Sequence, residues 1–336
     1  MSLPQRKVGD ATVSAVGYGF MGLSAFYGKV APTEERLRII DAVYDSGVTF
    51  WDTADRYGDS EDLLGEWFKR TGKRNSVFLA TKFGIGYPGR TVNGEPEYVH
   101  QAINNSLKRL GVEHVDLWYL HRPDPAVPIE LTVGAMAKEV KAGKVKYLGL
   151  SECSVDTLRR AHAVHPITAL QVEYSPFTLD IEDPKIGLLK AARELGITII
   201  AYSPLGRGLL TGKYSSPDDF EEGDFRKRVA RYSQENFPNI LKIVDGLRAI
   251  GERHGATPGQ VSLAWLFAQG DDIIPIPGTT RVSALKENND SVKIKLSPAE
   301  VEEVRQLVNR ADAANGPRYP AGLLDVLFGN TPPLHK

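Results

Sequence analysis

The sequence has almost no cysteine, no long hydrophobic run and no excess of charge of one sign. Cys153 is the only cysteine among 336 residues, which excludes an intrachain disulfide and favours a reducing compartment. We expect a buried, inert thiol there rather than a redox sensor. No apolar run approaches the roughly 18 residues of a membrane span, and the N-terminus lacks the apolar core of a signal peptide. Lys and Arg total 41 against 42 for Asp and Glu, so no charge excess draws the chain to nucleic acid or an anionic membrane. These absences predict a cytoplasmic protein whose partner is a small molecule.

Short apolar runs alternate with amphipathic stretches along the whole chain. Such runs are typical of strands buried on both faces of a parallel sheet. Together with the intervening helices they predict an α/β fold, a (β/α)8 TIM barrel forming a single domain over residues 1–336. A doubly wound sheet is the alternative, but a barrel would bring the polar residues that follow the strands to one mouth. The candidate strands are Ala15–Tyr18, Val48–Asp52, Val77–Lys82, Val115–Leu120, Val145–Ser151, Ala169–Glu173, Thr198–Tyr202 and Ile273–Ile276.

Three additions to the barrel are expected. Arg6–Val16, with a turn at Gly9-Asp10, predicts an N-terminal β-hairpin. Phe83–Glu97 and Pro204–Phe237 are long segments that follow strands, so both would overhang the mouth. The tail after Asn309 would either cover the pocket or pack on a partner subunit, and the sequence leaves monomer and homo-oligomer undecided.

Helix boundaries are indicated by capping residues. Asp183, Thr257 and Ser297 each precede a proline, which predicts an N-cap with proline at the first helical position. Gly196 and Gly255 are expected to end helices.

The segment Gly17–Gly22 matches the GxGxxG pattern of dinucleotide-binding Rossmann folds. No helical pattern follows it until about Thr33, so no helix N-terminus would face a phosphate there. We therefore interpret the glycines as positions of close backbone approach, with Met21 free to lie against a flat ring.

Asp52, Tyr57, Lys82 and His121 lie at the ends of three successive strands or in the loops just after them, and they carry the predicted chemistry. Tyr57 would give a proton to a carbonyl oxygen while a hydride arrives at the carbon. Because the usual pKa of tyrosine is ~10, a neighbouring ammonium is needed to stabilise tyrosinate, and Lys82 would supply it. Asp52 would orient Lys82 through an ion pair, and His121 would hydrogen-bond the substrate oxygen.

Each of these residues also has a structural interpretation. Asp52 could cap a strand end, Tyr57 could be a loop aromatic, Lys82 a solvated strand end and His121 a structural histidine. A barrel hydrolase or isomerase using Asp52 and His121 fits poorly, because no second carboxylate or metal cluster accompanies them. We predict no metal site.

With these residues in place, the chain resembles the aldo-keto reductase superfamily, from about Val8 to Asn309. Within it the chain is most similar to the microbial and plant branch of broad-specificity, pyridoxal-reductase-like enzymes. The resemblance implies that the four residues are the catalytic tetrad and that NADPH/NADP+ lies extended across the mouth. The motifs are Gly47–Tyr57, Leu107–His121, Gly143–Ser151, Ala201–Lys213 and Ile274–Arg281, with Glu287-Asn288.

The resemblance also implies cofactor contacts. Arg281 is the expected partner of the 2′-phosphate, with Arg226 as a second clamp, which would favour NADPH over NADH. Tyr202 would stack on the nicotinamide ring. The nicotinamide amide would be held by Ser151, Glu152 and Gln171, the pyrophosphate by Ser203, Leu205, Gly206, Arg207, Gly208 and Lys213, and the adenosine end by Gly278, Thr280, Arg281, Glu287 and Asn288.

Two positions depart from the family pattern. Glu152 stands where much of the family has Asn, and a carboxylate accepts a hydrogen bond from a carboxamide but cannot donate one. Ala284 stands where many members carry Arg or Gln, which weakens the case for NADPH preference.

The sequence predicts an NADPH-dependent reductase of aldehydes or ketones, of the alcohol dehydrogenase (NADP+) type. The alternative is a cofactor-bound regulatory protein resembling the potassium-channel β subunits. Tyr27, Phe83, Tyr87 and Tyr319 suggest an aromatic-lined substrate pocket, although packing in the core would explain each equally well.

Overall fold

The computed structural model describes residues 3–86, 91–314, 316–320 and 326–334. Eight parallel strands form one sheet in the order β10-β9-β8-β7-β6-β5-β4-β3. The Gly17 amide, just before β3, donates to the carbonyl of Pro275 at the end of β10 (2.9 Å), which joins the two sheet edges. The predicted (β/α)8 barrel is confirmed. The strands are β3 (Tyr18–Gly19), β4 (Phe50–Asp52), β5 (Phe78–Phe83), β6 (Val115–Leu120), β7 (Val145–Ser151), β8 (Ile167–Glu173), β9 (Thr198–Tyr202) and β10 (Ile273–Pro275).

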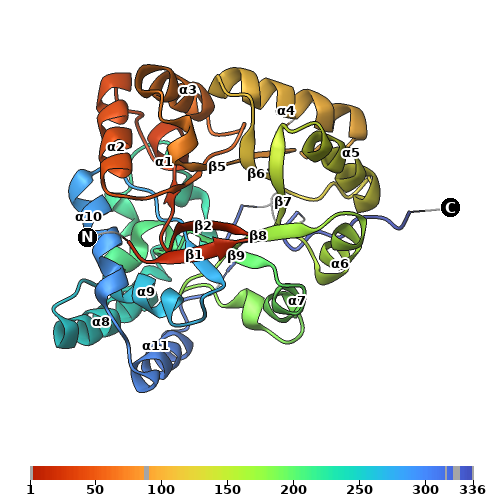
Figure 1. The fold of residues 1–336 in the computed structure, drawn as a ribbon. Helices are drawn as coiled ribbons and strands as arrows, with labels where there is room; N and C mark the ends of the chain where they lie inside the picture. The colour runs from red at the N-terminus through yellow and green to blue at the C-terminus, as the bar shows by residue number, and fades with distance from the viewer. Residues whose placement is uncertain (1–2, 87–90, 315, 321–325, 335–336) are drawn as a thin grey trace.

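Helices surround the strands on the outside of the barrel (Figure 1). Their apolar faces pack on the outer faces of the strands in one continuous core. The helices are α1 (Met21–Ser24), α2 (Thr33–Asp45), α3 (Ser60–Thr71), α4 (Pro96–Leu110), α5 (Ile129–Lys141), α6 (Val155–Val164), α7 (Leu188–Glu194), α8 (Phe237–His254), α9 (Pro258–Phe267), α10 (Val282–Asp290) and α11 (Pro298–Ala311).

The N-terminal hairpin closes one end of the barrel. Strands β1 (Gln5–Val8) and β2 (Ala11–Ser14) pair antiparallel around Gly9, whose φ is +60°. Val8 and Val13 are buried in the inner core beside strand residues such as Phe50. Since this end is plugged, the opposite end, at the carboxyl ends of the strands, is the open mouth. In Figure 1 the hairpin lies across the front of the ring of helices.

The expected caps are present at two of three predicted helix starts. Thr257 and Ser297 each form a capping box at the start of α9 and α11, and Gly255 ends α8 in the left-handed conformation. The start predicted at Asp183 is wrong. The Asp183 carboxylate accepts from the Lys185 amide (2.8 Å) in a turn instead, and α7 begins only after Gly187, at φ +66°.

The glycines of Gly17–Gly22 lie where backbone segments meet closely. A Cβ on Gly278 would lie 2.4 Å from the Gly19 carbonyl oxygen, and one on Gly17 would lie 2.6 Å from the Phe50 ring. The predicted close approach is therefore confirmed. A four-residue helix, α1, begins within the motif at Met21, earlier than the helix expected near Thr33.

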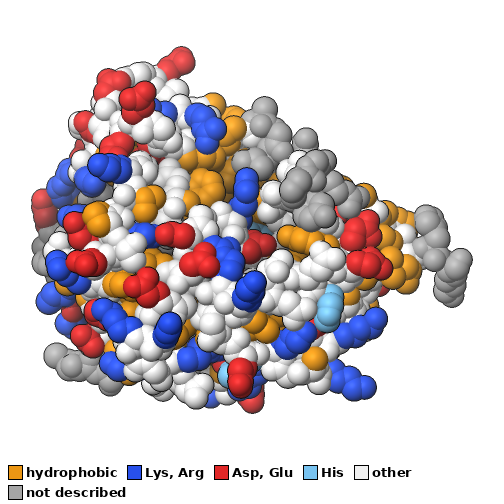
Figure 2. All heavy atoms as spheres, turned by 90° about the horizontal axis from the view of Figure 1, so that it is seen from above, with side chains coloured by type: hydrophobic (Ala, Val, Ile, Leu, Met, Phe, Trp, Pro, Cys, Tyr) orange, Lys and Arg blue, Asp and Glu red, His pale blue; other side chains and the backbone are white. Residues whose placement is uncertain are grey.

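The overhang of the two long segments stays a prediction, and residues 87–90 of Phe83–Glu97 lie outside the described residues. Residues 204–237 contain four short 3-10 helices, and none of them continues the barrel. On the face shown in Figure 2, basic and acidic side chains are interspersed rather than gathered by sign, in keeping with a formal net charge of −1. Within the described residues, no helix combines the length and the apolar composition that crossing a membrane requires.

Candidate active site

Lys82 is the centre of the site at the barrel mouth. It lies in β5, next to β4, and its side chain is 0% exposed. Its ammonium nitrogen donates to Asp52 Oδ1 (2.5 Å), to the Thr53 carbonyl (2.7 Å) and to the Tyr57 hydroxyl oxygen (3.4 Å). An ammonium group has three N–H donors, so all three are used. The predicted contact between Lys82 and Tyr57 is present.

Burial disfavours the protonated, charged form of Lys82. Removal from water lowers the pKa of Lys82, and the Asp52 carboxylate offsets only part of that effect. Asp52 has a second partner in Gln171, whose amide nitrogen donates to Oδ2 (2.8 Å). Gln171 therefore orients the Asp52–Lys82 pair in this structure.

The acidity of Tyr57 differs from the expectation. Burial, together with the nearby Asp52 carboxylate, raises the pKa of Tyr57 well above its usual value, and Arg122 opposes this only in part. The expected net lowering of the Tyr57 pKa is therefore wrong. Tyr57 keeps its proton at neutral pH. Because the hydroxyl oxygen already accepts from Lys82, its own O–H is free to donate elsewhere.

His121 lies beside Tyr57 directly after β6. The two ring centroids are 5.8 Å apart and the ring planes are at 84°. Burial, followed by the charges of Arg122 and Lys82, lowers the pKa of His121 well below its usual value, so the imidazole is neutral. Its Nδ1 is buried and has no hydrogen-bond partner within the described part of the chain. A neutral imidazole can donate one hydrogen bond to an oxygen placed between it and Tyr57.

The residues predicted for the nicotinamide lie together at the ends of β7, β8 and β9. Ser151 Oγ accepts from Arg122 (3.0 Å). The Tyr202 hydroxyl donates to Glu152 Oε1 (2.8 Å), and Glu152 has a left-handed φ of +51°. Arg122 adjoins His121 in sequence, but sequence reasoning gave it no role.

A buried ion cluster, formed by Glu152, Glu173, Arg207 and Arg318, was also missed. Arg318 contacts Glu152 (2.9 Å) and Glu173 (3.1 Å), and Arg207 contacts Glu173 (3.2 Å). All four side chains are buried. A signal was available, because acidic residues following buried strands require cations to compensate them.

The predicted pyrophosphate loop has an unusual backbone. Ser203, Gly206, Arg207 and Gly208 have positive φ values of 48°, 56°, 57° and 90°. Left-handed residues mixed with right-handed ones are a backbone pattern that suits anion binding. Here the Gly206 and Gly208 amides donate to the carbonyls of Ser203 (2.9 Å) and Leu205 (3.0 Å) within the loop. Arg207 NH1 is buried and has no partner among the described residues. Nearby, Leu205 is half-buried and Lys213 is exposed.

Arg226 is not free to act as a second clamp. Its Nε and NH2 donate to Asp224, and NH1 donates to the Arg207 carbonyl (2.9 Å). The rings of Tyr27, Tyr214 and Phe220 surround the guanidinium at 5.1, 4.6 and 4.4 Å. Binding a phosphate would require leaving these partners.

The residues predicted for the adenosine end lie around the start of α10. Arg281 is its exposed N-cap, with Gly278 and Thr280 exposed just before it. Glu287 accepts from the Thr257 hydroxyl (2.6 Å), and Asn288 is buried. Met21 is half-buried at the start of α1.

The predicted aromatic lining stays a prediction for Tyr319 and is wrong for Phe83. Tyr319 lies against Phe225 (6.0 Å between centroids), and Phe26 lies against both Phe225 and Tyr57 (6.3 Å each). Phe83 instead stacks on Trp118 in the core (4.2 Å) and is wrong as a lining residue. Tyr27 packs on Arg226, and Tyr87 lies outside the described residues.

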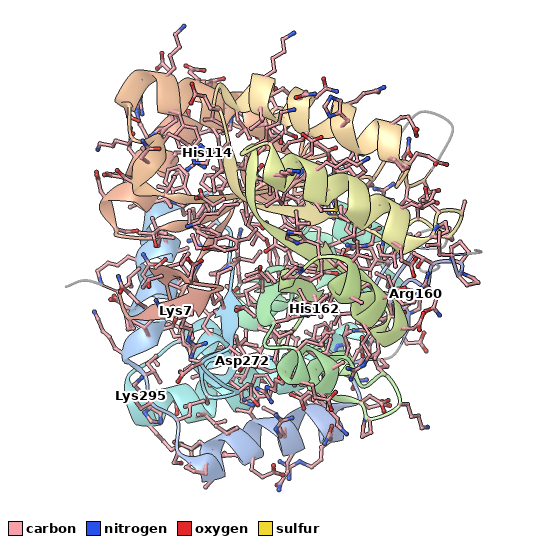
Figure 3. All side chains as sticks on the ribbon, turned by 45° about the vertical axis from the view of Figure 1, so that its right-hand side comes forward. Lys7, His114, Arg160, His162, Asp272 and Lys295 are labelled. Carbon is pink, nitrogen blue, oxygen red and sulfur yellow. The ribbon has the colours of Figure 1, made fainter. Side chains whose placement is uncertain are left out.

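Residues 3–86, 91–314, 316–320 and 326–334 contain no group of three His, Cys, Asp or Glu side chains able to hold a metal ion. His162, which lies on α6 (Figure 3), has Nδ1 within hydrogen-bond distance of the Ile167 amide (3.2 Å).

The parallel barrel and its buried Lys–Asp pair beside a tyrosine and a histidine agree with a comparison of sequences. The sequence profile of the Aldo/keto reductase family matches residues 15–309. The chain belongs to this family, whose members are oxidoreductases of carbonyl groups.

Individual relatives cover nearly the whole chain. The aldo-keto reductase str7 of Strobilurus tenacellus is 59% identical over 317 residues, 93% of this chain and 94% of that protein. The aldo-keto reductase yakc [NADP(+)] of Schizosaccharomyces pombe is 52% identical over 342 residues, with both chains fully covered.

Solved structures support the fold. The glycerol dehydrogenase AKR11B4 from Gluconobacter oxydans superposes with a TM-score of 0.83 at 26% identity, covering 93% of this chain and 97% of that one. The thermostable aldo-keto reductase Tm1743 gives a TM-score of 0.74 at 29% identity, covering 91% and 100%.

Proposed function

We propose that the protein is a single-domain, NADPH-dependent reductase that converts aldehydes or ketones to alcohols, with Tyr57 as the proton donor. The observation that carries the proposal is the set of three hydrogen bonds donated by Lys82, one of which ends on the Tyr57 hydroxyl. It is an alcohol dehydrogenase of the NADP+ type, and its single, buried cysteine suits the cytoplasm.

The mouth has features that fit an extended dinucleotide phosphate. The left-handed backbone of the loop at Ser203–Gly208 suits the pyrophosphate, as does the buried Arg207 NH1, which has no hydrogen-bond partner among the described residues. Ser151, Gln171 and Tyr202 would hold the nicotinamide end, and Arg281 the 2′-phosphate. When bound, NADPH supplies the hydride that is added to the carbonyl carbon. The name of the yeast relative, which includes NADP(+), supports this assignment.

The chain's own residues handle the proton and the orientation of the carbonyl. Lys82 holds the Tyr57 oxygen so that the phenol O–H points away from it, and His121 donates a second hydrogen bond to the substrate oxygen. As negative charge develops on that oxygen, the Tyr57 proton transfers to it. Asp52 keeps Lys82 in place, and Gln171 keeps Asp52 in place.

The test is NADPH oxidation against a panel of aldehydes, ketones and quinones, with detection of the alcohol product. We expect turnover with at least one carbonyl class and slower turnover with NADH. Tight NADPH binding with no oxidation across the panel would overturn the proposal in favour of a cofactor-bound regulatory protein.

A further inference from the structure

Both ends of a C-terminal segment are attached to one residue, Glu152. Its carbonyl accepts from the Gly329 amide (2.9 Å), and its carboxylate accepts from Arg318 NH1 (3.0 Å) and NH2 (2.9 Å). The Gly329 carbonyl in turn accepts from the Ser154 amide (3.0 Å). The tail is therefore bound directly to the end of β7, beside Ser151.

Arg318 uses every part of its guanidinium at this place. NH1 also lies 3.1 Å from Glu173 Oε2 and 3.3 Å from the Tyr202 hydroxyl, and Nε pairs with Asp180 (3.2 Å). The Arg318 side chain is 4% exposed and that of Glu152 is 0% exposed. Because the Arg318 side chain is shielded from solvent and its N–H groups already have acceptors, we assign it no role in capturing a charged substrate.

Glu152 depends on Arg318 for its charge. Within the described residues Arg318 is the only cation in salt-bridge contact with Glu152, whereas Glu173 also has Arg207. Although burial opposes ionisation, Arg318 keeps the pKa of Glu152 below its usual value. A buried carboxylate deprived of its partner either takes up a proton or moves toward water.

Tyr202 is oriented through the same contact. Its hydroxyl donates to Glu152 Oε1 (2.8 Å) and lies 3.0 Å from the Tyr319 hydroxyl. Tyr319 in turn packs its ring on Arg207 (4.5 Å). Two consecutive tail residues, Arg318 and Tyr319, therefore set the position of the aromatic ring on which the nicotinamide is proposed to lie.

We propose that Arg318 is a positioning residue of the reaction site: from the C-terminal tail it holds the Glu152 and Glu173 carboxylates and, through Glu152, the Tyr202 ring. This rests on the proposed function. It also accounts for Glu at position 152, where much of the family has Asn. The carboxylate is one half of an ion pair whose other half comes from the tail.

The closing experiment compares Arg318→Met, Arg318→Lys, Glu152→Gln and the double variant Glu152→Gln/Arg318→Met. The readouts are the affinity for NADPH, the affinity for 2′,5′-ADP and the rate of NADPH oxidation. Because 2′,5′-ADP carries only the adenosine end, it reports on the region of Arg281 and not on Tyr202.

We expect Arg318→Met to weaken NADPH binding by about tenfold or more and to lower kcat, with 2′,5′-ADP binding unchanged. Arg318→Lys should recover part of the loss. The double variant should bind NADPH more tightly than Arg318→Met does, because no charge is left uncompensated. It also keeps the test available should Arg318→Met fail to fold.

Arg160→Met is the matched control. Arg160 also attaches the tail, by donating to the carbonyls of Thr331 (3.0 Å) and Pro332 (2.6 Å), but it does so from α6 on the outside of the barrel (Figure 3). Its loss should leave NADPH binding unchanged.

The inference would be overturned if Arg318→Met lost affinity for NADPH and for 2′,5′-ADP equally, or if Arg160→Met weakened NADPH binding as much as Arg318→Met does. Arg318 would then have only a structural role. An Arg318→Met enzyme with unchanged affinity and kcat would also overturn the inference. Failure of the proposed function is distinct, since the unaltered protein would then not oxidise NADPH at all.

Discussion

The ammonium nitrogen of Lys82 lies 3.4 Å from the hydroxyl oxygen of Tyr57. The lysine is on β5 and the tyrosine is in the loop after β4, so the parallel pairing of these strands brings the two together. Because the lysine donates, the tyrosine oxygen acts as acceptor in this contact and retains its own proton for a substrate. The direction of this hydrogen bond, and not a lowered pKa, is what makes Tyr57 a candidate to protonate a carbonyl oxygen.

Asp52→Asn should destabilise the protein, because it leaves the buried Lys82 ammonium without its ion-pair partner. We expect a loss of about 3 kcal/mol in the free energy of unfolding, measured by chemical denaturation. Asp245→Asn is the control. It removes an exposed pair with Arg248 and should cost less than about 0.5 kcal/mol. Equal effects of the two substitutions would contradict the account of Lys82.

Asp55→Asn should change how stability depends on pH. Burial, followed by the charge of Glu61, raises the pKa of Asp55 to about 7. An aspartate titrates near 4 when unfolded, so between these values the folded state binds more protons and stability falls as pH rises toward 7. The Asp55→Asn variant has no carboxylate at this position, so its stability does not fall with pH for this reason. Relative to the parent its free energy of unfolding should gain about 2–3 kcal/mol between roughly pH 5 and pH 8.

Thermal unfolding of Asp55→Asn and the parent at about pH 5 and pH 8 measures this gain in stability. The exposed Asp45→Asn serves as the control and should show no pH-dependent difference from the parent. An Asp55→Asn variant that follows the parent at both pH values would show that the carboxylate is not protonated in the folded protein.

Arg281→Ala should weaken NADPH binding with little change for NADH. Arg281 is exposed at the N-cap of α10, where its guanidinium and the helix N-terminus would both attract the 2′-phosphate. Removing one charge-assisted contact costs about 1.5–3 kcal/mol, or roughly 10- to 100-fold in affinity. Dissociation constants for both nucleotides measure the difference, and an equal loss for both would remove the proposed role.

The fold and the tetrad were largely predictable, and the buried carboxylates of the ion cluster gave a signal, whereas the cations that pair with them could not be predicted. Val115–Leu120, Val145–Ser151 and Thr198–Tyr202 were predicted with the bounds that the structure has, because short apolar runs between helices are a strong local signal. The contact between Lys82 and Tyr57 could be predicted because both residues lie at or just after the ends of strands. A barrel brings these strand ends together at one mouth.

Arg318 lies 166 positions from Glu152, and no local pattern links the two. The direction of the Tyr57 pKa shift was predicted wrongly, also because no local pattern in the sequence determines it. How far a phenol is buried, and which carboxylate lies near it, depend on the packed structure and not on spacing in the sequence.

The most direct test of the central claim is a single turnover of bound NADPH with saturating carbonyl in Tyr57→Phe and in the parent. The account predicts a rate of NADPH oxidation lower by at least about 100-fold, with the dissociation constant of NADPH unchanged. A phenylalanine variant that oxidises NADPH as fast as the parent would contradict the assignment of Tyr57 as proton donor.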